Sequence, residues 1–369
     1  MKTLVTGGAG FIGTHLVQRL LDDDHQVVVL DSLSSQVHAG GDPELPADVE
    51  FFHGAVGDAE LVDEALIGVD RVVHLAAAVG VGQSMYEIAS YVRQNTMDTA
   101  VFLERLVQQS ERPRRLVVAS SMSIYGEGEY VCPNHDRVAP APRTDEQLAS
   151  REWECFCPQC AAELKPVGTA ETKPLIPTSI YAITKRDHEE MCLVIGDAYE
   201  IPTVALRFFN VFGPGQALSN PYTGVAAIFA SRLLNGRAPL IFEDGLQSRD
   251  FIHVSDIVEG IVLALETETA VGAALNLGTG RPTTVREVAA VLGDGLGVDV
   301  EPEIVEQYRA GDIRHCYADP SRAAERLGFR ARTTLEDGMA ELIEWLAGQE
   351  ATDKVEAATA ELVSRGLAR

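Results

Sequence analysis

The stretch TGGAGFIG at residues 6–13 decides the fold of this chain. An apolar run at 3–6, predicted to be a strand, leads into it, and a helical stretch at 11–21 follows. Glycine tolerates positive φ and lets backbone N–H groups come close to a pyrophosphate, and the first turn of a helix offers unpaired donors. A Gly-rich turn also occurs merely to pack a strand against a helix, but its place between the two favours a dinucleotide site here.

The end of the next predicted strand, at 26–30, indicates which dinucleotide fits. Asp31 ends that strand, 18 residues after Gly13. A carboxylate there accepts hydrogen bonds from the adenosine ribose and repels a 2′-phosphate, and no Arg follows at 32–35. The sequence therefore favours NAD over NADP, although Asp31 taken alone is also typical of a strand-end turn.

The pattern of strands and helices continues along the chain. Short β-rich runs lie at 71–75, 115–120 and 203–206, and helical stretches lie at 92–109 and 181–198. Strands separated by helices indicate parallel βαβ units with right-handed crossovers. The sequence predicts an α/β protein with a Rossmann-like, doubly wound parallel sheet. Beyond 211 the alternation is irregular, which predicts a smaller C-terminal α+β lobe.

Four parts of the chain follow from this pattern. We expect residues 1–126, 176–212 and 250–280 to form the dinucleotide-binding domain, and 213–249 with 281–350 to form the smaller lobe. Residues 127–175 are rich in Pro, Glu and Cys, show no clear strand or helix period, and are interpreted as an insertion. Residues 351–369 predict a polar helix lying on the surface; a subunit contact is the less favoured interpretation.

Composition excludes several classes of protein. The 369 residues are 46% hydrophobic and 23% charged, which is ordinary for a globular protein able to bury a core. The formal charge of −25 argues against a surface that binds nucleic acid or anionic lipid. No apolar run is long enough for a membrane helix, and the N-terminus lacks the features of a signal peptide, so a cytoplasmic protein is expected.

The insertion carries a pattern typical of a metal site. Cys132 and His135 form one CxxH pair, and Cys157 and Cys160 form a CxxC pair 21 residues further on. This spacing resembles a zinc ribbon, in which each turn points two ligands at one ion, and four protein ligands make the site structural. Cys155 is an alternative to Cys157, and a loop of free cysteines is the alternative to a metal site.

The helix predicted at 181–198 begins with the sequence YAITK, which places a phenol and an ammonium on one face. The charge of Lys185 favours the phenolate of Tyr181, so the tyrosine can take a proton from a sugar hydroxyl near neutral pH. Ser121 lies at the end of the 115–120 strand, where α/β folds place residues that contact ligands. YxxxK alone is common on helix surfaces.

Taken together, these motifs resemble the extended short-chain dehydrogenase/reductase family, and within it the NAD-dependent nucleotide-sugar epimerases. The motifs are GGAGFIG at 7–13, HLAA at 74–77, Asn95, SSMSIYG at 120–126, YAITK at 181–185, RFFN at 207–210, RDFIHV at 249–254 and RAGD at 309–312. The stretches at 76–89 and 209–224 are most similar to those of members described as dTDP-rhamnose 4-epimerase-like. The resemblance covers nearly the whole chain except the insertion and the tail.

The resemblance implies roles for particular residues. It makes Ser121 the hydroxyl partner, Tyr181 the acid/base and Lys185 the group that tunes it. The implied NAD contacts are Gly7, Gly10, Phe11, Ile12, Gly13, Asp31, Val56, Leu75, Ala76, Ala77, Asn95, Tyr181, Lys185 and Phe208. The implied substrate contacts are Ser123, Asn210, the diphosphate-binding Arg249 and Arg309, and Cys316, at the position that limits bulk near the sugar. The family's adenine-contacting Asp is replaced by Ala55, and Asp58 is an alternative contact.

The residues after Ser121 distinguish between reactions. Dehydratases of the family carry an Asp-Glu pair there, whereas this chain has Met122 and Ser123. The expected reaction is therefore NAD-dependent epimerisation at carbon 4 of a nucleotide-diphosphate sugar through a transient 4-keto intermediate. Another enzyme of the family, a dehydratase or reductase, and a non-catalytic NAD sensor remain alternatives. The base, UDP or dTDP, stays open, and the resemblance implies a homodimer built from the helices at 92–109 and 181–198.

Overall fold

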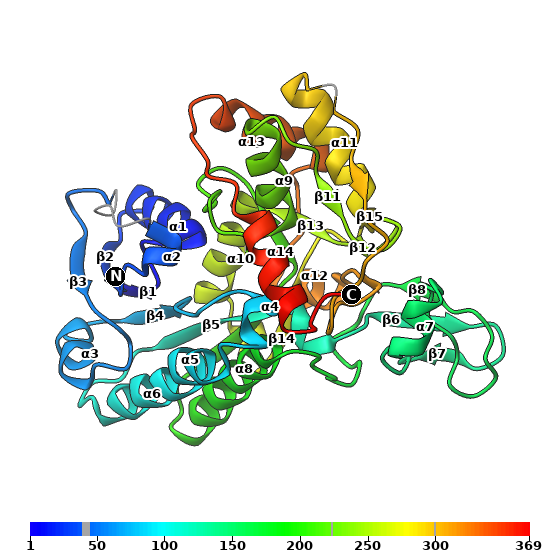
Figure 1. The fold of residues 1–369 in the computed structure, drawn as a ribbon. Coiled ribbons are helices and arrows are strands. Elements are labelled where there is room, and N and C mark those ends of the chain that lie inside the picture. The colour runs from blue at the N-terminus through cyan, green and yellow to red at the C-terminus, as the bar shows by residue number, and fades with distance from the viewer. Residues whose placement is uncertain (39–44, 223, 299) are drawn as a thin grey trace.

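A seven-stranded parallel sheet forms the centre of the protein (Figure 1). The computed structural model describes residues 1–38, 45–222, 224–298 and 300–369. The strand order is β14-β9-β5-β4-β1-β2-β3, so the predicted Rossmann-like sheet is confirmed. The strands are β1 (Lys2–Thr6), β2 (Gln26–Asp31), β3 (Glu50–His53), β4 (Arg71–His74), β5 (Arg115–Ser121), β9 (Thr203–Phe208) and β14 (Ala274–Leu277).

Helices cover both faces of this sheet, which is why its central strands are runs of Val, Leu and Ala. One face packs against α1 (Phe11–Asp22), α10 (Val254–Glu266) and α12 (Ser321–Leu327). The other packs against α3 (Ala59–Ala65), α6 (Asp98–Gln108) and α8 (Ile180–Ala198). The strand order switches direction between β1 and β4, so the connections after these two strands run to opposite faces of the sheet and leave a crevice at their carboxyl ends, the position where such folds bind nucleotides.

The helix predicted at 92–109 is not uniform. Its first part, Val92–Met97, is a π-helix, and α6 continues it as an ordinary α-helix. A π-turn inserts one residue per turn and is often found at functional sites, because it re-aims a side chain. Asn95 lies within it. The shorter helical segments nearby are α2 (Ser35–His38), α4 (Val81–Ser84), α5 (Ile88–Tyr91) and the 3₁₀ turn Met122–Tyr125.

The insertion has regular structure that its sequence did not reveal. It contains β6 (Glu129–Cys132), β7 (Asp136–Val138), α7 (Asp145–Ala149) and β8 (Lys165–Val167). The strands form a separate antiparallel sheet in the order β7-β6-β8 and project from one side of the molecule (Figure 1). Strands of three or four residues are too short to show a period, and β8 joins β6 across a long loop, so the pairing is not readable locally.

The smaller lobe is built from three helices and short strand pairs. Its helices are α9 (Val225–Leu234), α11 (Val285–Leu296) and α13 (Leu335–Leu346), which share one apolar core. Its strands are β11 (Leu240–Ile241), β12 (Ser248–Arg249), β15 (Thr283–Thr284), β16 (Glu303–Ile304) and β17 (His315–Cys316). The strands β10 (Asn210–Phe212) and β13 (Phe251–His253), which pair with each other, and the 3₁₀ turn Glu268–Ala270 before β14 lie in the stretches expected to form the dinucleotide-binding domain.

The C-terminal helix is shorter than predicted and does more than lie on the surface. Only Val355–Ser364 is helical, as α14. Leu362 is buried, and the residues after the helix return to the protein, where Ala368 bridges Arg309. In Figure 1, α14 crosses the front of the molecule between α4 and α9.

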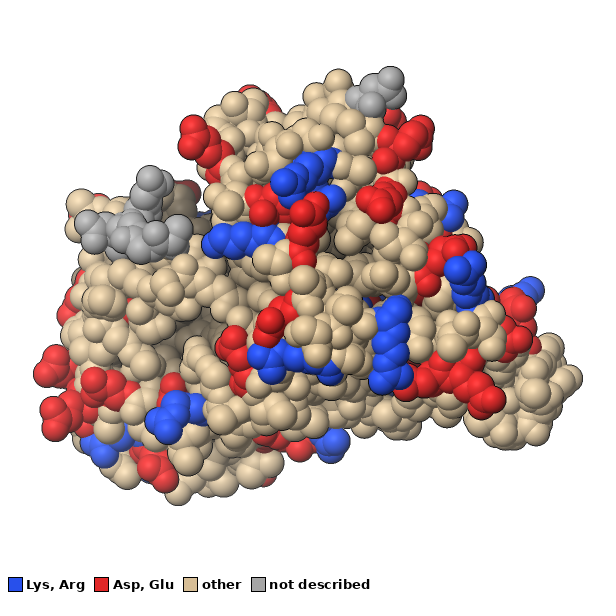
Figure 2. Space-filling model, viewed as in Figure 1, with Lys and Arg blue, Asp and Glu red and all other residues tan. Residues whose placement is uncertain are grey.

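Charge is distributed as the composition suggests. On the face drawn in Figure 2, acidic side chains occur over both lobes and the insertion, and the basic ones are interspersed among them. Among the described residues, no helix is long and apolar enough to cross a membrane.

Candidate active site

The Gly-rich turn lies at the crevice between β1 and β4. Gly7 has a φ of +71°, and a Cβ there would lie 2.8 Å from the backbone nitrogen of Ala76. A Cβ on Gly13 would lie 2.3 Å from the carbonyl oxygen of Gly7. Glycine is therefore required at both positions, because α1 packs directly against the turn and the turn against the end of β4.

The N-terminus of α1 is open for an anion. Its N-cap is Gly10, which has no side chain to cap the helix. By contrast, α3 and α8 are capped by the side chains of Asp58 and Ser179. The N–H groups at the start of α1, from Phe11 and Ile12, lack intrahelical partners and sit at the positive end of the helix dipole. These backbone donors can bind the pyrophosphate of a dinucleotide, so the residues present fit such a cofactor.

Asp31 is tied to the turn. Its carboxylate accepts hydrogen bonds from the backbone nitrogens of Ala9, at 3.0 Å, and Leu33, at 2.9 Å. The carboxylate thus lies beside the Gly-rich turn, where the sequence expects the adenosine ribose. Asp58, the alternative adenine contact, instead accepts a hydrogen bond from Leu61 N as the cap of α3. Val56, in the loop before α3, is buried.

Asn95 holds the loop after β4 against α8. Its Oδ1 accepts from the backbone nitrogen of Ala78 at 2.7 Å, and its Nδ2 donates to the Ala78 carbonyl and to Thr184 Oγ1 at 2.9 Å. The side chain is fully buried and its amide is fully used within the protein. Asn95 therefore positions Leu75, Ala76 and Ala77, the segment that lines the crevice.

Tyr181 and Ser121 come together from different elements. Ser121 ends β5, beside Phe208 of β9, and Tyr181 lies in the first turn of α8. The backbone nitrogen of Tyr181 donates to Ser84 Oγ at 3.0 Å, which fixes the start of α8 against α4. Burial raises the pKa of the Tyr181 phenol, and a hydrogen bond with Ser121 opposes that rise.

Lys185 is buried one turn further along α8. Burial lowers the pKa of its ammonium to about 8. Its Nζ lies 3.4 Å from Nδ1 of His188, and His188 Nε2 lies 2.8 Å from Thr99 Oγ1. That hydroxyl also contacts His74 at 3.0 Å, so a buried polar chain runs from Lys185 to β4. Burial also holds the pKa of both imidazoles low, so the ammonium faces neutral rings.

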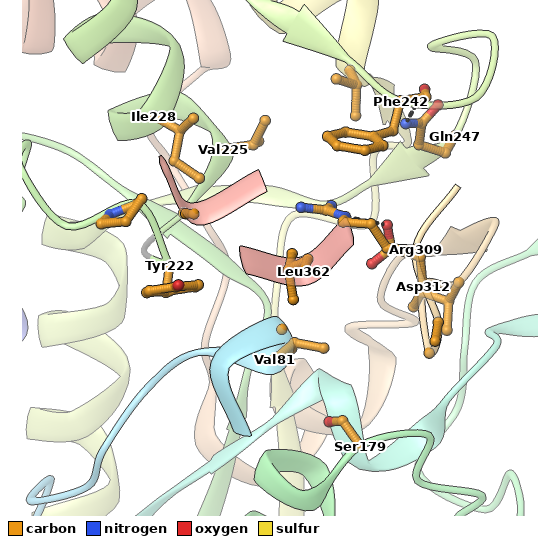
Figure 3. Close-up of a pocket in the computed structure, with 18 of the residues that line it drawn as sticks. Val81, Ser179, Tyr222, Val225, Ile228, Phe242, Gln247, Arg309, Asp312 and Leu362 are labelled. Carbon is orange, nitrogen blue, oxygen red and sulfur yellow. Dashed lines mark hydrogen bonds and ion pairs between the residues drawn. The ribbon is translucent and has the colours of Figure 1, made fainter. Parts of the chain in front are cut away.

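A cavity of about 280 Å³ opens beside these residues (Figure 3). Its walls come from α4, the end of β5, the start of α8, the smaller lobe and α14. Its polar lining includes Ser123, Ser179, Asn210, Gln247, Arg249, Arg309 and Asp312. The cavity therefore joins the turn after β5 and the residues just before α8 to the smaller lobe, and Ser121, Tyr181 and Lys185 are not among the residues that line it.

Three residues expected to contact the substrate line this cavity: Arg249 and Arg309 carry guanidinium groups suited to phosphate, and Asn210 has an amide oxygen that can accept a hydrogen bond from a substrate donor. Asn210 Oδ1 is buried and has no hydrogen-bond partner among the described residues. Arg249 donates to the carbonyl oxygens of Ile313 and Arg314, at 2.6 and 2.9 Å, which fixes its guanidinium at the cavity edge. Arg309 pairs with Asp312 at 2.8 Å and lies over the ring of Phe242.

Ser123 and Cys316 differ in their surroundings. Ser123 lines the cavity, and its Oγ donates to Ser121 Oγ at 2.9 Å. Cys316 is buried on β17, with Sγ 3.8 Å from Thr169 Oγ1, and is not among the residues that line the cavity. β17 pairs with β12, so Cys316 lies beside Arg249 in the neighbouring strand.

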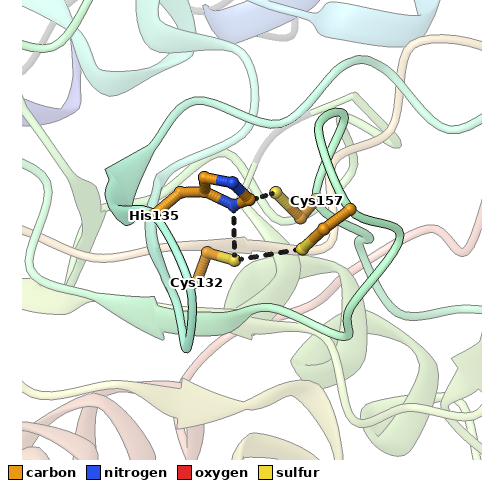
Figure 4. Close-up of side chains that lie close together, drawn as sticks. Cys132, His135 and Cys157 are labelled. Atoms are coloured by element: carbon orange, nitrogen blue, oxygen red, sulfur yellow. Dashed lines mark hydrogen bonds between the residues drawn. The ribbon is translucent and has the colours of Figure 1, made fainter.

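The four expected metal ligands of the insertion converge (Figure 4). The ligand atoms of Cys132, His135, Cys157 and Cys160 all lie within 4.8 Å of one another. Cys155 points elsewhere: its thiol contacts the Tyr130 hydroxyl at 3.4 Å inside the small core of the insertion.

Comparison with known proteins agrees with the fold and the site. Residues 3–146 and 155–278, more than half of the chain, match the NAD dependent epimerase/dehydratase family. The chain belongs to this family. A dTDP-L-rhamnose 4-epimerase of Burkholderia thailandensis is 32% identical over 350 residues, 94% of this chain and 95% of that protein.

Solved structures of this epimerase/dehydratase family superpose on the chain. A UDP-glucose 4-epimerase from Thermotoga maritima, solved with UDP-glucose, has a TM-score of 0.76 at 30% identity and covers 94% of this chain and 99% of its own. A UDP-glucuronic acid 4-epimerase from Bacillus cereus, solved with UDP-glucuronic acid and NAD, has a TM-score of 0.76 at 27% identity and the same coverage.

Several cavity residues were not identified from the sequence. Phe242 and Tyr222 of the smaller lobe, Val81 of α4 and Leu362 of α14 line the cavity. Asp312 lay within the RAGD motif, but its pairing with Arg309 was not anticipated. Apolar side chains of this kind carry no local signal, because their role depends on which distant segment they face.

Proposed function

We propose that this protein is an NAD-dependent 4-epimerase of a nucleotide-diphosphate sugar, carrying a UDP or dTDP group. The observation that carries the proposal is that one cavity joins two kinds of group. Ser123 and Ser179, next in the chain to the Ser121 and Tyr181 region, line this cavity, and so do the guanidinium groups of Arg249 and Arg309, which are suited to a diphosphate. Membership of the family and the 4-epimerases among its relatives support the same reaction.

In this proposal the side chains move one proton. Tyr181, assisted by Ser121, takes the proton from the 4-hydroxyl, and the ammonium of Lys185 stabilises the phenolate that the reaction needs. The Gly-rich turn and the N-terminus of α1 would hold NAD, which would supply a reversible hydride acceptor for carbon 4, so that no net oxidation would result. Between the two transfers the 4-keto sugar turns over while the diphosphate stays bound to Arg249 and Arg309. Tyr181 then returns its proton to O4.

Dehydration, the main alternative, requires a carboxylate free to drive elimination. Among the described residues that line the cavity, the carboxylates are Glu243 and Asp312. Glu243 is paired with Arg143 and Arg314 at 2.8 and 3.0 Å, and Asp312 is paired with Arg309. Both are therefore engaged, and the positions after Ser121 hold Met122 and Ser123, so epimerisation is favoured.

Incubation with a panel of UDP- and dTDP-sugars, followed by NMR of the product, tests this function. We expect a product inverted at carbon 4 and no accumulation of NADH. A 4-keto-6-deoxy product without an epimer, or net consumption of NADH, would overturn the proposal in favour of a dehydratase or a reductase.

We propose further that the insertion binds one structural Zn²⁺ through Cys132, His135, Cys157 and Cys160. Cys132 Sγ lies 3.4 Å from His135 Nδ1 and 3.6 Å from Cys160 Sγ, and Cys157 Sγ lies 3.6 Å from His135 Nδ1. Tetrahedral zinc with ordinary bond lengths separates its ligands by about 3.5–3.8 Å. These three ligand–ligand distances are close to those of a zinc site, and all four atoms lie within 4.8 Å of one another.

Elemental analysis of protein purified without added metal tests the zinc site. We expect about one zinc per chain, as a closed four-ligand site requires. The double variant Cys157→Ser/Cys160→Ser should lose it, whereas Cys155→Ser should keep it, because Cys155 faces Tyr130. Absence of zinc in the unmodified protein, or retention by the double variant, contradicts the assignment.

We also propose a homodimer located in the cytoplasm. Large apolar side chains of the two helices expected to form the interface are exposed: Val92, Met97, Ile183 and Val194. Sedimentation should give about twice the chain mass, because a dimer would cover these exposed apolar side chains. Met97→Glu/Val194→Glu should give a monomer and Val363→Glu, on α14, should not. The six unpaired cysteines and the proposed zinc thiolates suit a reducing compartment.

A further inference from the structure

The C-terminal segment 353–369 lies across the cavity and contacts it along its whole length. Val355, Ala358 and Leu362 of α14 line the wall. In Figure 3, Leu362 lies between Val81 of α4 on one side and Val225 and Ile228 of α9 on the other. Its Cδ1 lies 3.6 Å from where a Cβ on Gly82 would sit, which is van der Waals contact.

The start of this segment is attached to the smaller lobe. The Asp353 side chain, only 3% exposed, lies 3.3 Å from the guanidinium groups of both Arg232 and Arg237. The same carboxylate accepts from the backbone nitrogen of Val355 and so begins α14. Further along, the guanidinium of Arg365 lies over the ring of Tyr86, next to α4.

The end of the segment forms a short antiparallel pairing with residues 308–310. Tyr308 N donates to the Arg369 carbonyl at 2.9 Å and Arg369 N donates back at 3.0 Å. Ala310 N donates to the Leu367 carbonyl at 2.8 Å. The paired backbone is the one that carries Arg309, whose side chain lines the cavity, so the chain terminus holds both neighbours of Arg309 in place.

The insertion supports the same backbone from the other side. Tyr308 packs in a small buried cluster with Leu148 and Trp153 of the insertion. The side chain of Arg369 pairs with Asp145 of α7. Residues 308–310 are therefore held between two segments that lie outside the parallel sheet.

We propose that segment 353–369 is a working part of the nucleotide-sugar site, in which the terminal residues 367–369 position Arg309 against the diphosphate and Leu362 closes the cavity wall. A guanidinium binds a diphosphate well only when its N–H groups are oriented towards the phosphate oxygens. The pairing of residues 367–369 with 308–310 fixes the backbone that carries the Arg309 side chain. The ligand class is a nucleoside diphosphate, and the inference rests on the function proposed above.

Deletion of residues 367–369 from the NAD-containing protein tests the positioning role. UDP and dTDP serve as probes in calorimetry, and the sugar nucleotide turned over serves in kinetics. We expect the Kd of the better-bound diphosphate and the KM to rise about tenfold or more, the effect of losing one charge-assisted contact. NAD content should stay constant and kcat should change little. Val363→Ala, at an exposed position of α14 that neither lines the cavity nor joins the backbone pairing, should change Kd less than about twofold.

Combining the deletion with Arg309→Met shows whether the terminus acts through Arg309. If it does, the deletion should add little to the loss already caused by Arg309→Met, because both remove the same contact. Fully additive losses, or a deletion that leaves Kd and KM unchanged, overturn the positioning role. If unmodified protein binds neither UDP nor dTDP, the proposed function fails and this inference fails with it.

A pair of tryptophan variants tests the cavity wall without shortening the chain. Leu362→Trp places a larger ring in the cavity and should weaken diphosphate binding about tenfold or more, since a packed site tolerates added volume poorly. Val363→Trp puts the same ring on the solvent side, because Val363 is 49% exposed, and should leave binding unchanged. Equal binding by both variants, each with full NAD content, contradicts the assignment of Leu362 to the site.

Discussion

The parallel sheet and the insertion place their chemistry in different ways. In the sheet, the residues of the site stand where a strand ends or a helix begins: the Gly-rich turn after β1, Ser121 at the end of β5 and Tyr181 at the start of α8. In the insertion, the four candidate metal ligands stand on two separate turns brought together by antiparallel pairing of β6 with β7 and β8. The first arrangement follows from local motifs, whereas the second depends on how distant segments pack.

A buried ion network joins the insertion to the smaller lobe. Arg314, fully buried, pairs with Glu154 of the insertion at 2.6 Å and with Glu243 and Asp244 of the smaller lobe at 3.0 and 2.7 Å. Arg143 of the insertion pairs with the same Glu243 at 2.8 Å. Because Glu243 lines the cavity, the insertion contributes to the substrate side of the site although it lies outside the sheet.

The largest effect should come from the sheet. Tyr181→Phe removes the acid/base and should lower kcat by about 10²–10⁴-fold, the usual worth of general acid–base catalysis, while NAD content stays constant. Tyr199→Phe, at the exposed end of the same helix, should retain activity. Steady-state kinetics and the NAD content of both proteins give the comparison. Near-normal turnover by Tyr181→Phe would remove Tyr181 from the mechanism.

The next largest effect should come from the ion network between the insertion and the smaller lobe, and it should be an effect on stability. Arg314→Met leaves the carboxylates of Glu154, Glu243 and Asp244 without their shared cation and should lower the free energy of unfolding by about 3–5 kcal/mol. Arg186→Met removes an exposed pair with Glu190 and should cost only about 0.3–0.5 kcal/mol. Urea unfolding measures both. Equal losses would mean that the insertion and the lobe are not coupled through Arg314.

Burial of the Lys185 ammonium should lower the free energy of unfolding. Its folded pKa of about 8 lies below the ordinary 10.5, so the folded protein disfavours the ammonium. Below pH 8 the wild type bears the full cost of burying the charge, and between pH 8 and 10.5 that cost falls because the folded form gives up its proton first. At pH 7, Lys185→Met should therefore be more stable and inactive.

Thermal unfolding of NAD-free samples across this pH range checks the Lys185 prediction. The difference in Tm between Lys185→Met and the wild type should be widest below pH 8 and should narrow towards pH 10.5. A constant difference would show that the charge of Lys185 costs nothing in the folded protein.

The smallest effect should come from Asp58, at the N-terminus of α3. Asp58→Ala should cost about 1 kcal/mol of stability through loss of the helix cap, and Asp58→Asn should cost little because Asn caps equally well. Neither change should alter NAD affinity, since the carboxylate is occupied by Leu61 N. Lower NAD affinity in both variants, measured by calorimetry, would instead place Asp58 at the adenine.

The sequence predicted the type of sheet and five of its seven strands, for local reasons, but did not locate β3 and β14. Buried parallel strands are runs of Val and Leu, and Gly7 and Gly13 stand where backbone segments touch, so both leave a pattern in the sequence. The π-helix around Asn95 was missed, because one extra residue in a turn does not disturb the apolar spacing over a long helix. The tail was predicted as a surface helix, because nothing in its sequence shows that Leu362 meets Gly82.

By itself, the sequence determined the Rossmann-like sheet, the dinucleotide turn, the candidate catalytic side chains and the four candidate metal ligands, because each depends on residue types at fixed short spacings. Only the tertiary structure decided that Cys155 faces Tyr130, that Arg314 joins the insertion to the smaller lobe, and that the chain terminus pairs with the backbone of Arg309. These contacts join residues far apart in the chain, and their geometry depends on packing that no local pattern records.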